Sequence, residues 1–278
     1  MCGDMMIRII DSIEKIRKLF EISKISKQNW EEYFLNTCPK LISTIYEDAD
    51  KYNYDEQIIP LFENIRSNPS RLDNLHMNFM LAVKDLEIRM VDILGETIDF
   101  TIIFYLGLGN AAGWAFRQGD DGYLLLGVEK IIELNWDELL DLQALLYHEA
   151  GHLIHQKYQV DDLDKDYDGV WRLYIEGLAM VIEQELLMNE SYFHQNKAGW
   201  LESIRRLENI YINDFRRRVN LRLSTDDYFG DWCNVFDISD VGYYLGHKFV
   251  RRLLEKYSLN ELLKMDKLKV EEEFGLLF

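Results

Sequence analysis

Three of the chain's six histidines lie in one short stretch, LLYHEAGHLIHQ, from Leu145 to Gln156. His148 and His152 are four residues apart, a spacing that puts both imidazoles on one face of a helix within reach of one ion. A catalytic zinc takes three protein ligands and leaves its fourth position to water. Glu149 would lie near that water and could accept its proton. The stretch therefore predicts a zinc site with a general base.

The residues around this HExxH motif favour a buried helix. WDELLDLQALLYHEAGHLIHQ, residues 136–156, keeps a helical period on both sides of the motif, and most of its residues next to the histidines are uncharged. A buried helix with two hydrogen-bonded histidines would share this pattern and is the structural alternative. His155 lies one turn beyond His152 but about 10 Å along the helix from His148. One tetrahedral ion cannot span that distance, so we expect His155 outside the ligand set, near the site or at the surface.

A third ligand must come from elsewhere in the chain. WRLYIEGLAMVIEQELL, residues 171–187, is predicted to be a helix with Glu176 beside the small residues Gly177 and Ala179. Small residues suit a helix pressed against another backbone, where the carboxylate could reach a metal, so Glu176 is favoured. The alternative is a solvated glutamate paired with Arg172. The remaining candidate ligands are Asp168, Glu183 and His194.

HExxH followed about two dozen residues later by a helical glutamate is similar to the gluzincin zinc peptidases, the group that includes thermolysin. More narrowly, HEAGH, EGLA and GYYLGHKFV resemble a bacterial family of predicted zinc-dependent proteases marked by HExxH, E-G-L-A and a late G-Y-x-x-G. The resemblance covers residues 98–257. It implies that His148, His152 and Glu176 hold zinc and that Glu149 is the general base.

The chain departs from two related classes. Metzincins carry glycine and histidine where this chain has His155 and Tyr158, so that class is excluded. Thermolysin-like enzymes have an aspartate four residues after the ligand glutamate, which orients a zinc histidine. Met180 stands at that position here. The orienting group must then come from elsewhere, and Glu183 and a backbone carbonyl are candidates.

The resemblance also implies a hydrogen-bond donor for the tetrahedral oxyanion of amide hydrolysis. SDVGYYLGHKFVRRLLEKY offers Tyr243, Tyr244 and His247. Tyr243 matches the tyrosine of G-Y-x-x-G and is the leading candidate, with His247 one helical turn further on. The alternative is a capped helix start whose aromatic residues pack in the core.

LGLGNAAGWAF, just before the zinc helix, is the predicted substrate strand. Zincins bind peptides in extended form along an edge strand, and the small residues of this stretch let a substrate backbone approach closely. Asn110-Ala111 also resembles an Asn-Ala pair in the edge strand of thermolysin. The alternative is a glycine-rich turn. The predicted substrate-binding residues are Asn110, Ala111, Ala112 and Gly113.

DLDKDYDG contains Asp164, Asp166 and Asp168, the opening of an EF-hand calcium loop. That loop needs a bidentate glutamate at its twelfth position, which falls on Ile175, and Glu176 comes one residue late. One residue on a helix rotates a side chain by about 100°. The match therefore fails, and a solvated acidic loop is favoured over a Ca²⁺ site.

Local patterns predict an α+β fold that is mostly helical. Residues 4–95 suggest about four amphipathic helices, with breaks near Lys27, Asn53 and Pro69. A strand over Ile98–Leu106 and a hairpin of GWAF, RQGDDG and YLLLGVE follow. Further helices are predicted near 136–158, 169–188, 197–220 and 240–257. We expect an N-terminal helical lobe, 1–95, and a zincin-like catalytic lobe, 96–278, with a small antiparallel or mixed sheet, the two forming one compact unit.

Composition limits the compartment and the partners. No apolar run approaches the ~18 residues of a membrane span, and the N-terminus lacks the apolar segment of a signal peptide. Cys2, Cys38 and Cys233 are few and scattered, as reduced cytoplasmic thiols are. A net charge of −18 argues against nucleic acid or an anionic membrane as partner. No feature of the sequence specifies an oligomeric state.

The function predicted from the sequence is zinc-dependent peptide-bond hydrolysis by a cytoplasmic metallopeptidase, with one Zn²⁺ per chain and a peptide or protein substrate. A catalytically inactive zincin-fold binding module is the alternative, but a purely structural zinc would not need Glu149 and would usually fill its fourth position. Glu149-x-x-His152 also fits the motif of di-iron proteins. That chemistry needs two such motifs, and the chain has one.

Overall fold

The computed structural model describes residues 7–95, 98–158 and 169–277, and the chain divides into two compact units. Unit 1 comprises residues 1–149 and unit 2 residues 150–278. Their boundary falls inside helix α8 (Leu139–Tyr158), whereas the change of sequence character predicts a boundary near residue 96. The N-terminal segment belongs to the same unit as residues 100–104, because residues 7–11 form a strand that pairs with them.

Unit 1 contains a mixed four-stranded sheet in the order β1-β2-β4-β3. β1 pairs parallel with β2, β2 pairs parallel with β4, and β3 pairs antiparallel with β4. The prediction of a mostly helical α+β fold with a strand and a hairpin in this region is confirmed. The strands are β1 (Ile7–Asp11), β2 (Phe100–Tyr105), β3 (Gly113–Gln118) and β4 (Asp121–Gly127).

The helical prediction is wrong for Ile7–Asp11, because these residues form strand β1. Its sequence, IRIID, is rich in β-branched isoleucine, which favours strands. Ile7 pairs with Phe100 and Asp11 with Phe104, so the strand is stabilised by a partner far along the chain.

The predicted breaks in the N-terminal helices are confirmed. Ser26 caps α2 before Lys27 with a reciprocal capping box, Asn53 caps a short π-helix, and Pro69 begins α5. The helices of unit 1 that precede α8 are α1 (Ile13–Phe20), α2 (Lys27–Leu35), α3 (Ile42–Ala49), α4 (Ile59–Ser67), α5 (Pro69–Lys84), α6 (Leu86–Arg89) and α7 (Val128–Leu134), with 3-10 turn Pro39–Leu41 and π-turns Tyr54–Ile58 and Met90–Leu94.

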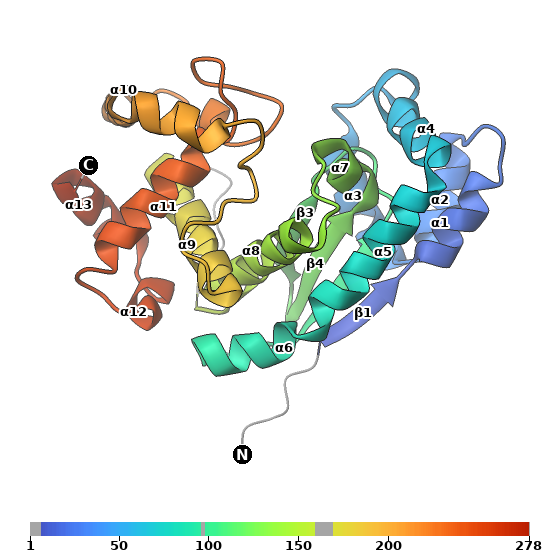
Figure 1. Ribbon diagram of the computed structural model, residues 1–278, viewed down its shortest axis with the longest axis horizontal. Coiled ribbons are helices and arrows are strands. Elements are labelled where there is room, and N and C mark those ends of the chain that lie inside the picture. The colour runs from blue at the N-terminus through green and yellow to red at the C-terminus, as the bar shows by residue number, and fades with distance from the viewer. Residues whose placement is uncertain (1–6, 96–97, 159–168, 278) are drawn as a thin grey trace. The chain divides into compact units, whose positions relative to one another are not determined.

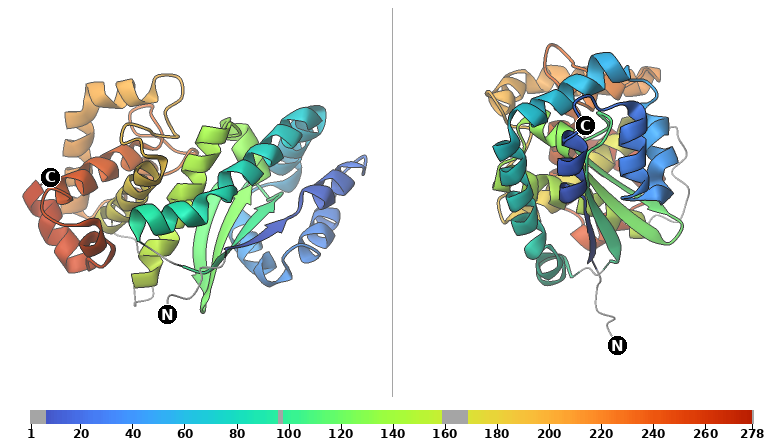
Figure 2. Two further views of the ribbon diagram at one scale, coloured as in Figure 1. Left: turned by 60° about the horizontal axis from the view of Figure 1, so that its bottom comes forward. Right: turned by 90° about the vertical axis from the view of Figure 1, so that its right-hand side faces the viewer.

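Helices cover both faces of the sheet. Phe104 and Tyr105 are neighbours in β2, so their side chains point to opposite faces. Phe104 stacks on Phe79 of α5, with ring centroids 4.6 Å apart, and Tyr105 meets Phe34 of α2 edge-on at 5.8 Å. The right-hand view of Figure 2 shows the strands between teal α5 and the blue helices. These two layers bury the sheet that supports β3.

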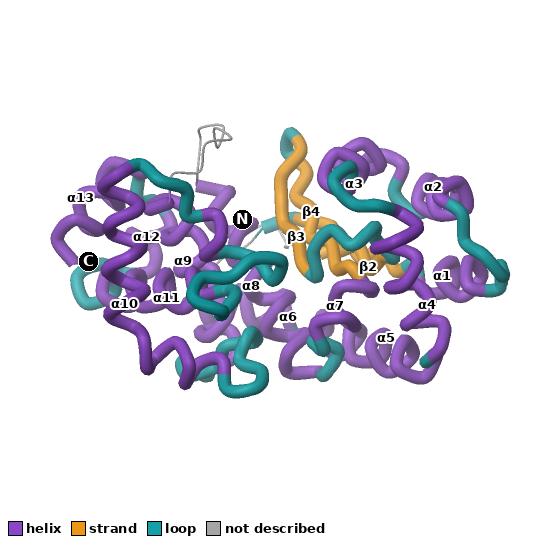
Figure 3. The backbone as a smooth tube through the Cα atoms, turned by 90° about the horizontal axis from the view of Figure 1, so that it is seen from above, coloured by secondary structure: helices purple, strands orange, loops and turns teal. Residues whose placement is uncertain are grey.

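The described part of unit 2 consists of helices joined by loops, without a strand, as Figure 3 shows. Val235 and Ile238 form an isolated bridge in one of these loops. The helices predicted near 169–188, 197–220 and 240–257 are confirmed. None of the described helices is both long and apolar enough to cross a membrane. The helices after α8 are α9 (Gly169–Leu187), α10 (Trp200–Leu221), α11 (Val241–Leu253), α12 (Leu259–Leu263) and α13 (Lys267–Leu277), with a 3-10 turn at Asp226–Tyr228 (Figure 1).

Candidate metal centre

Helix α8 carries the HExxH motif and is buried along most of its length. Its apolar residues on either side of the motif have almost no exposed surface, and His148 and Glu149 are 3% and 7% exposed. Polar groups at such depth need partners, because burying them without hydrogen bonds or a metal costs free energy. The buried helix expected from the sequence is therefore present.

His148, His152 and Glu176 form a group with the donor atoms of a metal site. One possible ligand atom from each lies within 4.8 Å of the others. His152 Nε2 and Glu176 Oε2 are 3.4 Å apart, beyond the usual range of a hydrogen bond. Ligands of a tetrahedral zinc, with bonds of about 2.0–2.1 Å, are separated by about 3.3 Å. Two nitrogens and one oxygen within 4.8 Å of one another could together hold a metal ion.

Glycine packing fixes the position of Glu176 on α9. A Cβ on Gly177 would lie 2.1 Å from the carbonyl oxygen of Gly246 in α11, and a Cβ on Gly246 would lie 2.4 Å from the carbonyl oxygen of Leu173. Both distances are far below any contact that a real Cβ makes, so α9 and α11 pack backbone against backbone. The prediction that small residues near Glu176 mark a helix pressed against another backbone is confirmed.

A second close approach joins α8 to α9 inside unit 2. A Cβ on Gly151 would lie 3.2 Å from Ala179 Cα and 3.3 Å from Ile182 Cβ. The glycine of HEAGH and the alanine of EGLA therefore let these helices meet at short range. This contact brings His152 within 3.4 Å of Glu176. Arg172, the alternative partner of that carboxylate, lies instead 3.5 Å from Asp226.

The start of β3 lies against the predicted general base. A Cβ on Gly113 would lie 2.7 Å from Glu149 Oε1 and 2.8 Å from Leu145 Cδ1. Only glycine leaves room for the carboxylate here. β3 is also the last strand in the sheet order, at its edge. The strand that the sequence predicts to bind substrate therefore begins next to Glu149.

Asn110 has a different surrounding from the one expected of a substrate-binding residue. Its side chain is 5% exposed, accepts the N–H of Leu108 at 3.1 Å, and donates to Ile45 O and to Asp48 Oδ2. These bonds hold the loop before β3 to α3. Ala112 follows, and its carbonyl accepts the N–H of Gly127 at 2.9 Å.

Tyr243 and Tyr244 begin α11 with different contacts. Tyr243 is half-buried, with its ring centroid 6.1 Å from that of Phe229. Tyr244 is buried and its hydroxyl donates to Glu208, so it belongs to a polar contact between α11 and α10. For Tyr243, the role of oxyanion donor that the G-Y-x-x-G resemblance implies stays a prediction.

His247 is bonded to Gln184 and Arg251. Its Nε2 lies 2.9 Å from Gln184 Oε1, which also accepts from Arg251 at 2.8 Å, while the amide of Gln184 donates to Tyr192 O. Nε2 carries the proton when it donates to Gln184 Oε1 and lacks it when it accepts the N–H of Arg251 Nε, 3.4 Å away. Burial, and then Arg251, lower the pKa of His247 to about 4, so the ring is neutral at pH 7. Gln184 comes eight residues after Glu176 on α9, about 12 Å along the helix.

Glu183 and His194, two of the remaining candidate ligands, pair with each other. Glu183 Oε2 lies 3.0 Å from His194 Nδ1, and both side chains are buried. Among the described residues, the group with His148 and His152 is the one set of three that could hold a metal. Asp168, the other remaining candidate ligand, and the acidic loop with Asp164 and Asp166 lie outside the described residues.

His155 is a core histidine. It is outside the ligand group, as predicted, but it is buried rather than at the surface, with its ring 5.7 Å from Trp171 and 6.1 Å from Tyr174. Burial lowers the pKa of His155 to about 3, so it is neutral at pH 7.

Sequence reasoning did not identify Glu129, a carboxylate in α7 that is 1% exposed. It accepts the backbone N–H groups of Gly107 and Gly109 in the loop before β3. The available signal was a charge directly after the apolar run YLLLGV. Such a charge is rarely buried without a specific partner.

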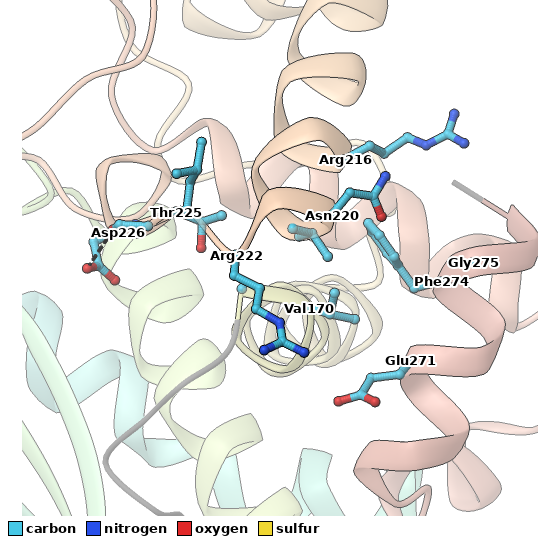
Figure 4. Close-up of a pocket in the computed structure, with 13 residues that line it drawn as sticks. Val170, Arg216, Asn220, Arg222, Thr225, Asp226, Glu271, Phe274 and Gly275 are labelled. Atoms are coloured by element: carbon cyan, nitrogen blue, oxygen red, sulfur yellow. Dashed lines mark hydrogen bonds between the residues drawn. The ribbon is translucent and has the colours of Figure 1, made fainter.

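A cavity of about 990 Å³ opens elsewhere in unit 2, between the start of α9, the end of α10 and α13. Figure 4 shows the charged side chains of Arg222 and Glu271 and the apolar side chains of Val170 and Phe274 around it. None of the candidate metal ligands lines it. The lining carries two arginines, Arg216 and Arg222, and two acids, Asp226 and Glu271, so its formal charges balance and select neither anions nor cations.

The chain matches no family model, and comparisons with curated proteins and with solved structures return no match.

Proposed function

We propose that this protein is a zinc-dependent peptidase of the gluzincin type, with one zinc per chain held by His148, His152 and Glu176. The observation that carries the proposal is the clustering of these ligand atoms within 4.8 Å. Glu149, next to His148 on α8, supports catalysis over a purely structural site. A structural zinc would take a fourth protein ligand and would have no use for a buried carboxylate beside it.

The chain's own residues then have distinct roles. Zinc, when bound, supplies Lewis acidity that polarises the scissile carbonyl and lowers the pKa of water. Glu149 takes the proton of the attacking water and passes it to the leaving amine. Tyr243 is the proposed donor to the oxyanion. The bonds of His247 to Gln184 and Arg251 favour Tyr243 over it.

The proposed substrate is a peptide or an unfolded protein segment in extended form along β3. An edge strand can add such a segment to its sheet through backbone hydrogen bonds, without fixing the sequence. Gly113 places the beginning of this strand against Glu149. Ala111 and Gly113, which are partly exposed, are the proposed residues along the approach. Ala112 is 4% exposed, and Asn110 braces the loop from within.

Metal analysis and hydrolysis of fluorescein-labelled casein test this proposal together. We expect about one zinc per chain, and activity that a chelator removes and zinc restores. Glu149→Gln should keep the zinc and reduce kcat by roughly 10²–10⁴-fold, because it removes the general base but none of the ligands. Zinc bound at full occupancy without hydrolysis by the wild type would instead identify an inactive binding module.

A further inference from the structure

A buried carboxylate holds the loop that leads into β3. Glu129 Oε2 accepts the N–H of Gly107 at 2.7 Å, and Oε1 accepts the N–H of Gly109 at 3.1 Å. A Cβ on Gly107 would lie 2.4 Å from Oε1, so the loop backbone lies directly against the carboxylate. Two backbone donors on two separate oxygens form a bidentate clamp.

The rest of the loop is fixed as firmly. The side chain of Asn110 accepts the N–H of Leu108, and the carbonyl of Ala112 accepts the N–H of Gly127. A Cβ on Gly127 would lie 2.5 Å from the carbonyl oxygen of Ala111, so the hairpin strand β4 also lies against the loop. Ala112 is followed in the chain by Gly113, which lies against Glu149. The clamp thus fixes the loop backbone that leads into Gly113, the residue that lies against the proposed catalytic base.

Stability alone does not account for a carboxylate at this depth. Burying an ion costs several kcal/mol, and an apolar side chain of similar size is often as stable or more so. Burial raises the pKa of Glu129 to about 6, and the loop N–H groups offset only part of this effect. What the carboxylate supplies, and an apolar side chain cannot, is a fixed position for two backbone N–H groups.

We infer that Glu129 is a positioning residue, which holds residues 107–112 so that the edge of β3 receives an extended polypeptide beside Glu149. The inference rests on the proposed function, because it takes β3 as the substrate strand. Glu129 acts through the loop and has no part in the chemistry itself.

Glu129→Gln is the discriminating change. Glutamine keeps the size of the side chain but has one carbonyl oxygen, and its amide group would face a backbone N–H as a second donor. One of the two loop bonds is therefore lost. Glu133→Gln is the matched control, since Glu133 lies on the same helix, is 43% exposed and pairs with Lys130. Gly109→Ala tests the loop from its other side, because Gly109 has a φ of +73° that alanine adopts only with strain.

Hydrogen exchange of the zinc-loaded full chain tests the clamp without any assay of activity. We expect the amides of residues 106–112 to exchange about tenfold faster in Glu129→Gln and in Gly109→Ala, and at the wild-type rate in Glu133→Gln. Unchanged exchange in both loop variants overturns the clamp. Circular dichroism checks that each variant is folded, and Gly109→Ala carries the test if Glu129→Gln is not.

Binding and kinetics with fluorescein-labelled casein test the positioning role. In the Glu149→Gln background, adding Glu129→Gln should raise the Kd about tenfold, and adding Glu133→Gln should leave it unchanged. With Glu149 intact, Glu129→Gln should raise KM about tenfold and change kcat less than twofold, at full zinc content. An unchanged Kd despite faster exchange overturns the inference, as does a failure of casein to bind. Zinc-loaded wild type that binds casein without cleaving it refutes the proposed hydrolysis alone, because the Kd comparison still decides the role of Glu129.

Discussion

Glu176 decides whether the two histidines of α8 form a complete site. A histidine pair alone gives two of the three ligands that a catalytic zinc needs. The 3.4 Å separation of His152 Nε2 and Glu176 Oε2 suits two ligands of one ion better than a direct hydrogen bond. The carboxylate is therefore the residue whose removal most directly tests the ligand set.

We expect Glu176→Ala to lower zinc affinity at least tenfold and to abolish casein hydrolysis, because one of three ligands is lost. The measurement is zinc bound per chain after dialysis against a weak chelator. Glu185→Ala is the control, since Glu185 lies on the same helix but pairs with Arg251 at the surface. Stoichiometric zinc in Glu176→Ala would show that another residue is the third ligand.

At the scale of elements, the crossing of α9 and α11 determines where that carboxylate lies. The helices meet at Gly177 and Gly246 with no side chain between their backbones. This contact explains why glycine directly follows the ligand in EGLA and ends the GYYLG stretch. Any side chain at either position must push the helices apart, and Glu176 moves with α9.

Gly177→Ala should therefore destabilise the fold by about 1–3 kcal/mol, despite the higher helix propensity of alanine, because the new Cβ meets a carbonyl oxygen. The affinity for zinc should fall as well, because Glu176 moves with α9. Gly275→Ala is the matched control: Gly275 lies in α13 with no atom within 4 Å of an added Cβ, so alanine should stabilise by about 0.5–1 kcal/mol. Denaturant unfolding measures both changes. Equal effects of the two substitutions would contradict this account of the crossing.

Elements with strong local signals were predictable from the sequence, and elements that depend on distant partners were not. The HExxH helix, the helix of Glu176 and the hairpin of β3 and β4 all show their own periodicity or turn residues. The sequence does not indicate β1 as a strand, because five residues carry little signal and its partner, β2, lies far along the chain.

The same distinction applies within the site. His148 and His152 could be predicted because helical spacing alone brings them together. Glu129 was missed because its partners are backbone N–H groups, which no residue type indicates. The contacts of His247 with Gln184 were equally unreadable, because they depend on how α11 lies against α9.

At the scale of the whole molecule, buried titratable groups make stability depend on pH in opposing directions. His155 and His247 have pKa values lowered to about 3 and about 4, so the unfolded chain binds protons more readily than the folded one as the pH falls. Burial raises the pKa values of Glu129 and Asp240 to about 6, so these acids take up protons first in the folded protein. The two histidines lower stability on acidification, and the two acids raise it.

Substitution of His247 isolates one of these contributions. The stabilising effect of His247 is fully present above its ordinary pKa of about 6.5 and is lost as the pH falls towards about 4. In that window the unfolded histidine is protonated and the folded one is not. His247→Gln keeps a donor for Gln184 and removes the titration. Between pH 7 and pH 5, the wild type should therefore lose on the order of 1–2 kcal/mol more unfolding free energy than the variant. Urea unfolding of both proteins at each pH, at the same zinc concentration, gives this difference directly. Parallel losses in the two proteins would mean that His247 titrates normally in the folded state and that its bonds to Gln184 and Arg251 do not require a neutral ring.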